Sequence, residues 1–195
     1  IALIIGAEKL SMITDWTDRA TCVLFGDGAG AVVLSASKSL TGIKGAVMGS
    51  DGNLSDLLKV PAGGSRYPFS QKTLEGKMHC IKMNGKEVFK HAVRCMCDAA
   101  LQVLEKCGCS AEEVKCIIPH QANMRIIQAI GERLGVTMDR FYLNLERVGN
   151  MSSASIPVAL DEAARKGRLE KGDKLLLISF GGGFTWGAML IEWGV

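Results

Sequence analysis

The sequence predicts an α/β fold, in which a sheet is covered by helices on both of its faces. Short apolar runs typical of strands alternate with longer amphipathic stretches typical of helices. The 195 residues are 48% hydrophobic and 22% charged, which is the composition of a globular protein with a buried core. Glycine-rich breaks between apolar runs occur near both ends of the chain and suggest a fold of two related halves.

The amino-terminal third is predicted to consist of strands and loops. Residues 1–8, IALIIGAE, are expected to form a buried strand, and residues 14–19 a polar loop. Residues 22–25 and 31–34 are predicted to be two strands joined by a turn over GDGAG. Residues 39–79 mix short apolar runs with glycine, proline and polar residues, which favours strands and surface loops. Because a core strand needs a neighbour, we expect a partner segment upstream of Ile1.

The rest of the chain alternates predicted helices and strands. Apolar side chains at three- and four-residue spacing indicate each helix, and a glycine follows each one. Ser110 and Glu113 resemble a capping box that opens the segment after the first helix. The expected helices cover residues 84–106, 121–134 and 152–166, and the expected strands cover residues 115–118, 174–180 and 185–193.

Charge, hydropathy and cysteine content exclude several classes of protein. A net charge of +3 is too small to indicate a nucleic-acid partner, and no apolar run reaches the roughly 18 residues of a membrane span. The amino-terminal residues lack the basic region and cleavage site of a signal peptide. The cysteine content suits the reducing cytosol, so we expect a cytoplasmic protein. Seven scattered cysteines, an odd number, indicate reduced thiols rather than a disulfide scaffold.

A metal site is the alternative interpretation of four of these cysteines. Cys95 and Cys97 form one closely spaced pair, and Cys107 and Cys109 form another. The first pair lies inside a predicted helix, where side chains two residues apart point in different directions. We therefore expect no metal and no resident cofactor.

Three segments depart from an ordinary α/β layer. The segment IIPHQANMRII places His120 at the carboxyl end of a strand, which is the edge where open α/β sheets carry their sites. In VGNMSSAS, Gly149 permits a tight backbone before the amide of Asn150. Residues 181–183 are three glycines that leave the backbone bare for a close-approaching group. A buried structural histidine, a helix cap and a hairpin bulge are the respective structural alternatives.

Five segments in order resemble the β-ketoacyl-acyl-carrier-protein synthase III family: TDRATCVLFGDGAGAVVLS, MNGKEVFKHAV, PHQANMRII, GNMSSAS and GGGFTWG. Together they extend over nearly the whole chain. The resemblance implies a thiolase-like fold with α-β-α-β-α layers, built from two similar halves. It assigns residues 1–38 to the end of the amino-terminal half and residues 39–195 to the carboxy-terminal half.

The resemblance implies the initiating condensation of fatty-acid synthesis. An acyl group, usually acetyl from the substrate acetyl-CoA, is transferred to a cysteine, and malonyl-ACP then loses carbon dioxide to give a carbanion that attacks the acyl-enzyme. His120 and Asn150 would be the histidine and asparagine of a Cys-His-Asn site and would donate hydrogen bonds to the developing oxyanion. The nucleophilic cysteine would lie upstream of Ile1, so we expect this chain alone to be inactive.

The resemblance also implies binding residues and partners. Gly182 would offer a backbone N–H to a second oxyanion hole, and Phe180 would pack beside the nucleophile. Lys86 departs from the asparagine that family members often have beside the pantetheine arm. We expect a homodimer that binds acyl carrier protein through Lys90, Arg125 and Arg133. The channel for coenzyme A or phosphopantetheine would be lined by Arg19, Gly85, Phe89, Ala122, Asn123 and Arg125.

Two other functions fit the sequence. Another thiolase-fold condensing enzyme is the nearer one, although elongating synthases would carry a second histidine in place of Asn150. A thiolase-like binding subunit with no nucleophile is the other. The segment upstream of Ile1 would distinguish the binding subunit from an enzyme. A cysteine in that segment, followed by a helix of small residues, would support the enzyme.

Overall fold

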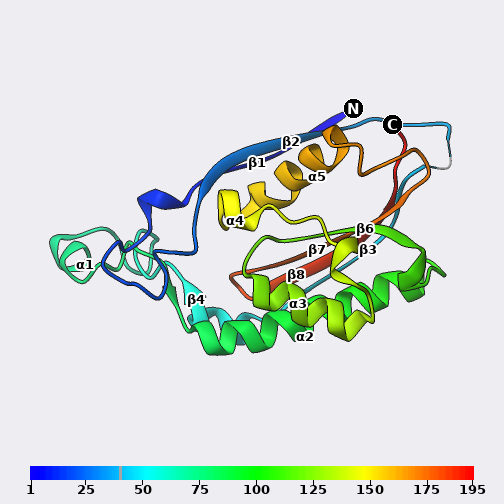
Figure 1. The fold of residues 1–195 in the computed structure, drawn as a ribbon. Coiled ribbons are helices and arrows are strands. Elements are labelled where there is room, and N and C mark those ends of the chain that lie inside the picture. Colours follow the sequence, from blue (N-terminus) through cyan, green and yellow to red (C-terminus); the bar gives the residue numbers. More distant parts are fainter. Residues whose placement is uncertain (40) are drawn as a thin grey trace.

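The computed structural model describes residues 1–39 and 41–195, which form five α-helices, eight strands and several short 3-10 helices (Figure 1). The strands are β1 (Ala2–Lys9), β2 (Asp27–Leu34), β3 (Gly42–Ser50), β4 (Leu58–Lys59), β5 (Lys82–Met83), β6 (Val114–Pro119), β7 (Lys174–Gly181) and β8 (Thr185–Glu192). The α-helices are α1 (Gln71–Glu75), α2 (Gly85–Lys106), α3 (Met124–Leu134), α4 (Leu145–Val148) and α5 (Ser155–Arg165). The 3-10 helices are Leu10–Met12, Gly52–Leu57, Ala111–Glu113, Met138–Arg140 and Ser152–Ala154.

The main elements stack in four layers, as Figure 1 shows, while α1 and the small sheet of β4 and β5 lie to one side. Helices α2 and α3 form the first layer, and a four-stranded sheet of order β3-β8-β7-β6 forms the second. Helix α5 is the third layer, and the two-stranded sheet of β1 and β2 is the fourth. The order α-β-α-β agrees with four of the five predicted layers, and the part of the chain that the structure describes holds no helix beyond β1 and β2.

The four-stranded sheet carries the core of the molecule. Strands β6 and β7 are parallel, and the other neighbours are antiparallel. In β7, Leu176 and Ile178 face the side of α2 and α3, while Leu175 faces α5, and all three are fully buried. A strand buried on both faces explains the continuous apolar run that predicted it. The predicted strands over 115–118, 174–180 and 185–193 are confirmed to within one residue.

The predicted helices are also present, with shifted starts. Helix α2 is capped by Asn84, whose side chain accepts the N–H of Glu87, and it ends just before Gly108, which has a φ of +60°. Helix α3 begins three residues later than predicted, because Asn123 is its cap and accepts the N–H of Arg125. The third predicted helix begins as a 3-10 turn over Ser152–Ala154 before α5.

The predicted hairpin over residues 22–34 is wrong. Residues 22–24 form turns, Phe25 forms an isolated bridge with Asn150, and all of GDGAG except its first glycine lies inside β2 rather than between two strands. Its glycines are required by packing: a Cβ on Gly28 would lie 2.3 Å from Sδ of Met151, and one on Gly30 would lie 2.9 Å from Cβ of Pro157. The bare backbone therefore lets the segment before α5 and the start of α5 contact the sheet closely. The GGG segment between β7 and β8 is a true hairpin turn, so the two glycine-rich segments differ in structure.

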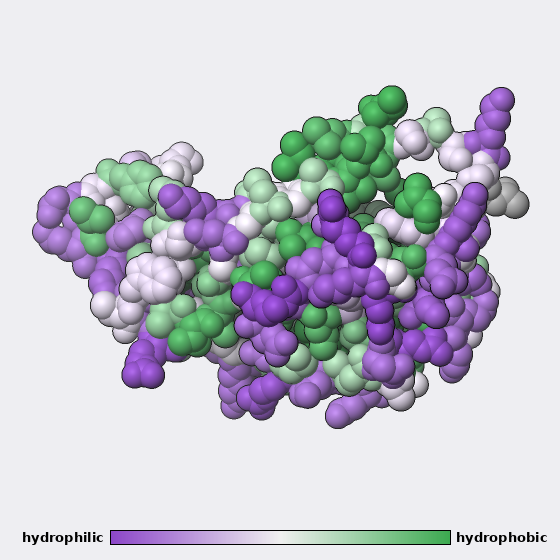
Figure 2. All heavy atoms as spheres, turned by 45° about the horizontal axis from the view of Figure 1, so that its top comes forward, coloured by the Kyte–Doolittle hydropathy of each residue, from purple (hydrophilic) through white to green (hydrophobic). Residues whose placement is uncertain are grey.

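The first predicted strand is present as β1, and in this chain much of its apolar surface is exposed. Leu3 and Ile5 on β1 and Val33 on β2 lie on the face away from α5, and their side chains are 61%, 62% and 65% exposed. Figure 2 shows a hydrophobic patch at the top of this view of the molecule. The opposite face of this sheet is partly covered: Val32 packs against the cluster around α5, whereas Ile4, which pairs with Val32, is 53% exposed. Among the described helices, none has both the length and the hydropathy that crossing a membrane requires.

Candidate active site

A cavity of about 1150 Å³ lies where the carboxyl ends of β6 and β7 meet the first turns of α2 and α3 and the loop over residues 13–26. Most of its wall is apolar, which suits a site that excludes water. Nine of the twelve predicted site residues line it: Gly85, Phe89, His120, Ala122, Asn123, Arg125, Asn150, Phe180 and Gly182. The fold thus brings together residues that are up to 97 positions apart in the sequence.

His120 directly follows β6, and its backbone is fixed on both sides. Its N–H donates to the carbonyl of Ile178 at 2.7 Å, and its own carbonyl accepts the N–H of Ala122 at 2.9 Å. Burial lowers the pKa of the imidazole to about 4. The ring is therefore neutral at pH 7, with one nitrogen as a donor and the other as an acceptor. It reaches the cavity in a form suited to donating one hydrogen bond.

Asn150 lies between α4 and the 3-10 helix Ser152–Ala154. Its N–H donates to the carbonyl of Leu24, and its carbonyl accepts the N–H of Gly26, each at 2.9 Å. The side-chain Oδ1 accepts the N–H of Ser152 at 2.9 Å. Because Oδ1 is occupied, the Nδ2 amide is the end of the side chain left to donate hydrogen bonds. Gly149 before it adopts a φ of +70°, which favours glycine.

Phe180 and Gly182 form the wall contributed by β7 and the turn after it. The ring of Phe180 is buried and stands 4.8 Å from the ring of Phe184, centroid to centroid, at a tilted angle. Such a contact holds an apolar surface in place beside the polar groups. A Cβ on Gly182 would lie 3.2 Å from the carbonyl oxygen of Leu58, so the turn passes close to β4.

Positive charge gathers at the starts of α2 and α3. The guanidinium of Arg125 lies over the ring of Phe89, 5.6 Å from its centroid, and both residues line the cavity. Lys86, the departure from the family pattern, lines the same cavity and is exposed. These two cations form a basic rim that suits phosphate groups.

Three of the predicted binding residues lie outside the cavity. Arg19 is exposed on the loop over residues 13–26, where its neighbour Ala20 lines the cavity instead. Lys90 is exposed on α2. Arg133 forms an ion pair with Asp98 at 3.2 Å, which links α3 to α2.

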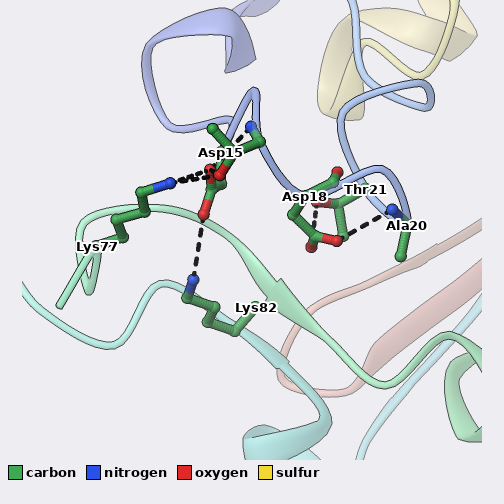
Figure 3. A network of polar contacts seen from close by, with 7 residues as sticks. Asp15, Asp18, Ala20, Thr21, Lys77 and Lys82 are labelled. Carbon is green, nitrogen blue, oxygen red and sulfur yellow. Dashed lines mark hydrogen bonds and ion pairs between the residues drawn. The ribbon is translucent and has the colours of Figure 1, made fainter.

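The loop over residues 13–26 is held by a network that the sequence did not reveal (Figure 3). Lys77 donates to the buried carboxylate of Asp15 at 2.9 Å, and Lys82 lies 3.8 Å from its other oxygen. The hydrogen bond from Lys77, with further ones from Thr17, holds the pKa of Asp15 well below its usual range. Because Asp15 and Lys77 are 62 residues apart, no local spacing in the sequence points to this contact.

The cysteines do not contribute to this site. Among the described residues that line the cavity there is no cysteine. Burial raises the pKa of Cys95, Cys109 and Cys116, and raises that of Cys97 to about 11, so these thiols are poor sources of thiolate. Within residues 1–39 and 41–195, no group of three or more His, Cys, Asp or Glu side chains is placed to hold a metal ion.

Comparisons with known proteins agree with the fold. The family described as 3-oxoacyl-[acyl-carrier-protein] synthase III matches residues 1–52, and its C-terminal part matches residues 104–193. The chain is 54% identical over 192 residues to the β-ketoacyl-[acyl-carrier-protein] synthase III of Desulfitobacterium hafniense, covering 98% of this chain and 58% of the relative. It is 51% identical over 191 residues to the synthase III of Clostridioides difficile, covering the same shares.

Solved structures give the same result. The 3-oxoacyl-[acyl-carrier-protein] synthase III of Aquifex aeolicus matches with a TM-score of 0.87 at 46% identity, over 98% of this chain and 57% of that one. The enzyme of Pseudomonas aeruginosa matches with a TM-score of 0.89 at 38% identity, over 100% and 58%. The chain thus spans somewhat more than half the length of the relatives it matches, and it has their thiolase fold. Two family matches that together cover most of the chain, and identities above 50%, establish that it belongs to the 3-oxoacyl-[acyl-carrier-protein] synthase III family.

Proposed function

We propose that this chain is part of an acyltransferase that condenses an acyl-CoA primer, acetyl-CoA in the simplest case, with malonyl-ACP to give 3-oxoacyl-ACP. The observation that carries the proposal is the pairing of two hydrogen-bond donors in one largely apolar cavity. His120 is neutral there, and the Oδ1 of Asn150 is held so that Nδ2 can donate. Both groups suit an oxygen on which negative charge develops.

The reaction needs such donors at its second step. When malonyl-ACP loses carbon dioxide, the electrons of the breaking C–C bond move onto the thioester enolate. Hydrogen bonds from His120 and Asn150 to the enolate oxygen would each lower the barrier by about 3 kcal/mol. The carbanion then attacks the acyl-cysteine carbonyl, the new C–C bond forms, and the thiolate leaves. Asn150 cannot titrate, so donation is the only role open to it.

The nucleophilic cysteine is assigned to the part of the enzyme outside these 195 residues. Two observations support this: no cysteine lines the described cavity, and the relatives are considerably longer than this chain. We use the term complete enzyme for the protein that contains this chain together with that cysteine. Gly182 would donate its N–H to the acyl-cysteine carbonyl, and Phe180 would keep water from the carbanion.

The basic rim provides the substrate side of the proposal. The pantetheine arm of coenzyme A or acyl carrier protein would enter between α2 and α3, past Phe89, Asn123 and Arg125. Acyl carrier protein is acidic, so Arg125, with Lys90 and Arg133 on the same pair of helices, suits its docking. Residues 1–38 would end the amino-terminal half, which agrees with the separate two-stranded sheet. The complete enzyme would be a cytoplasmic homodimer.

Substituting Asn150 tests the proposal. In the complete enzyme, Asn150→Asp places an anion beside a developing anion, so malonyl decarboxylation should fall by about 100-fold or more. Transfer of radiolabelled acetyl from acetyl-CoA to the cysteine should change by less than about threefold, since Asn150 takes no part in that step. Gln102→Glu, which also replaces an amide by a carboxylate but on an exposed part of α2 outside the cavity, is the matched control and should leave both rates unchanged.

The outcomes separate the proposal from its alternatives. An equal loss of both half-reactions in Asn150→Asp would remove Asn150 from the decarboxylation step. A complete protein that neither takes up acetyl nor releases carbon dioxide would identify a binding subunit. Acetylation of one of the seven cysteines in this chain, with turnover, would contradict the assignment of the nucleophile.

A further inference from the structure

Gln121 lies directly after His120, and its side chain is completely buried. Its Nε2 donates to the carbonyl of Pro119 at 2.9 Å and to the carbonyl of Tyr142 at 3.2 Å. Its Oε1 accepts the N–H of Asn144 at 3.2 Å. A buried amide that hydrogen-bonds three backbone groups on two segments fixes the position of one segment relative to the other.

The second of these segments leads to Asn150. The carbonyl of Asn144 accepts the N–H groups of Arg147 and Val148, which starts the single turn of α4. The N–H of Gly149 closes that turn on the carbonyl of Leu145 at 2.8 Å, and Asn150 follows. Only one rigid turn and one glycine therefore separate the residue that Gln121 holds from Asn150.

The same segment is anchored from the other side by α5. The Asn144 amide donates to Glu162 at 3.3 Å, and the Tyr142 hydroxyl donates to Glu162 at 3.0 Å. Arg147 also hydrogen-bonds the carboxylate of Glu162. These contacts orient the segment against α5, and Gln121 connects it to the end of β6 that carries His120.

We propose that Gln121 is a positioning residue that sets the separation of the His120 and Asn150 donors. This rests on the proposed function, in which both donors contact one enolate oxygen. A shift of one donor by about 1 Å costs on the order of 100-fold in rate, because both must reach the same atom. Transfer of the acyl group to the cysteine does not use this pair, so the effect falls on decarboxylation alone.

The substitution Gln121→Met in the complete enzyme keeps the length of the side chain and removes its three hydrogen bonds. We expect decarboxylation of malonyl-ACP, per folded molecule, to fall by about 100-fold, with KM for malonyl-ACP and acetyl transfer changed by less than about threefold. Exchange of the Asn144 backbone N–H with deuterium should become faster, since its acceptor is lost.

Arg140→Met is the matched control, because it also removes two hydrogen bonds from a side chain to backbone carbonyls near β6. Arg140 contacts the carbonyls of Val114 and Glu112 at the opposite end of that strand, far from His120. The Arg140→Met variant should have a lower Tm, with the ratio of the acetyl-transfer rate to the decarboxylation rate unchanged. If Gln121→Met does not fold, Gln121→Asn provides the test, with an expected selective fall of about tenfold in decarboxylation.

A proportional loss of both half-reactions in the folded Gln121 variant would overturn the inference and leave the proposed function intact, because it would show a structural role only. Unchanged decarboxylation with faster Asn144 exchange would overturn it as well. A wild-type complete enzyme without decarboxylation would instead refute the proposed function, and this inference with it.

Discussion

The two larger sheets of this molecule both contain strongly apolar strands, but only the four-stranded sheet has strands that are buried on both faces. In β7, Leu176 faces α2 and α3, Leu175 faces α5, and neither is exposed. In β1, Leu3 and Ile5 lie on the uncovered face and are more than 60% exposed. An apolar run therefore predicts a strand, whereas its burial depends on the elements that pack against it.

The candidate site lies where these two regions meet. His120 follows a strand of the covered sheet, while the backbone of Asn150 hydrogen-bonds to residues 24–26, which lead into the half-covered sheet. The proposed pair of donors thus depends on the contact between the regions. Substitutions in each region, with matched controls, test how much each region contributes to stability and to the proposed activity.

The largest expected difference is between a buried leucine of the four-stranded sheet and an exposed leucine of the sheet of β1 and β2. Leu176→Ala removes a fully buried side chain and should lower the free energy of unfolding by about 3 kcal/mol. In this chain by itself, Leu3→Ala on the exposed face of β1 should change this free energy by less than about 0.5 kcal/mol. Urea denaturation of both variants measures the two values. A similar loss in Leu3→Ala would mean that another surface covers β1 in solution.

The pH dependence of stability should reveal the burial of His120. The pKa of this imidazole is about 4 in the folded chain and 6.5 in the absence of burial, so the unfolded chain binds the proton first as the pH falls. Protonation of His120 therefore leaves the free energy of unfolding unchanged above about pH 6.5. As the pH falls to 4, it lowers this free energy by about 3 kcal/mol.

His120→Gln removes this titration and serves as the reference. The difference in unfolding free energy between wild type and the variant, measured by urea titration from pH 7 to pH 4, should follow the predicted loss. A difference that stays constant over this range would show that the imidazole is solvated. Malonyl decarboxylation should likewise show no inflection near pH 6.5 that arises from His120.

The packing of the half-covered sheet should respond to one methyl group. A Cβ on Gly6 would lie 2.5 Å from the carbonyl oxygen of Ser153, so Gly6→Ala should push the segment before α5 away and cost about 2 kcal/mol. Gly64→Ala, where no atom lies within 4 Å of the added Cβ, is the control and should cost less than about 0.5 kcal/mol. Thermal unfolding compares them, and equal Tm values would show that the contact is not close in solution.

The smallest expected effect concerns charge on the helices that cover the sheets. Arg125→Glu on α3 should reduce the use of malonyl-ACP by about tenfold at low salt, with the defect shrinking as salt screens the charges. Arg165→Glu on α5, which does not line the cavity, should have little effect. Steady-state kinetics with malonyl-ACP over a range of ionic strength compare the two variants. A defect independent of salt would exclude steering by Arg125.

The sequence predicted most of the elements and the chemistry of the candidate site. Helical spacing predicted α2, and continuous apolar runs predicted β6 and β7, because a buried strand or helix face leaves a periodic pattern. Short polar motifs singled out His120 and Asn150 as candidates, and the structure places both in one cavity. Their catalytic roles stay predictions.

Only the tertiary structure decided which surfaces are covered and which contacts hold the site together. GDGAG has the composition of a turn, but most of it lies in β2, which pairs with β1. Its glycines are needed because Met151 and Pro157, more than a hundred residues away, leave no space for side chains. The network of Gln121 and the ion pairs of Asp15 likewise join segments that are distant in the sequence. Local sequence patterns predict the backbone conformation and the buried face of a segment. The segments that it contacts depend on how the whole chain packs.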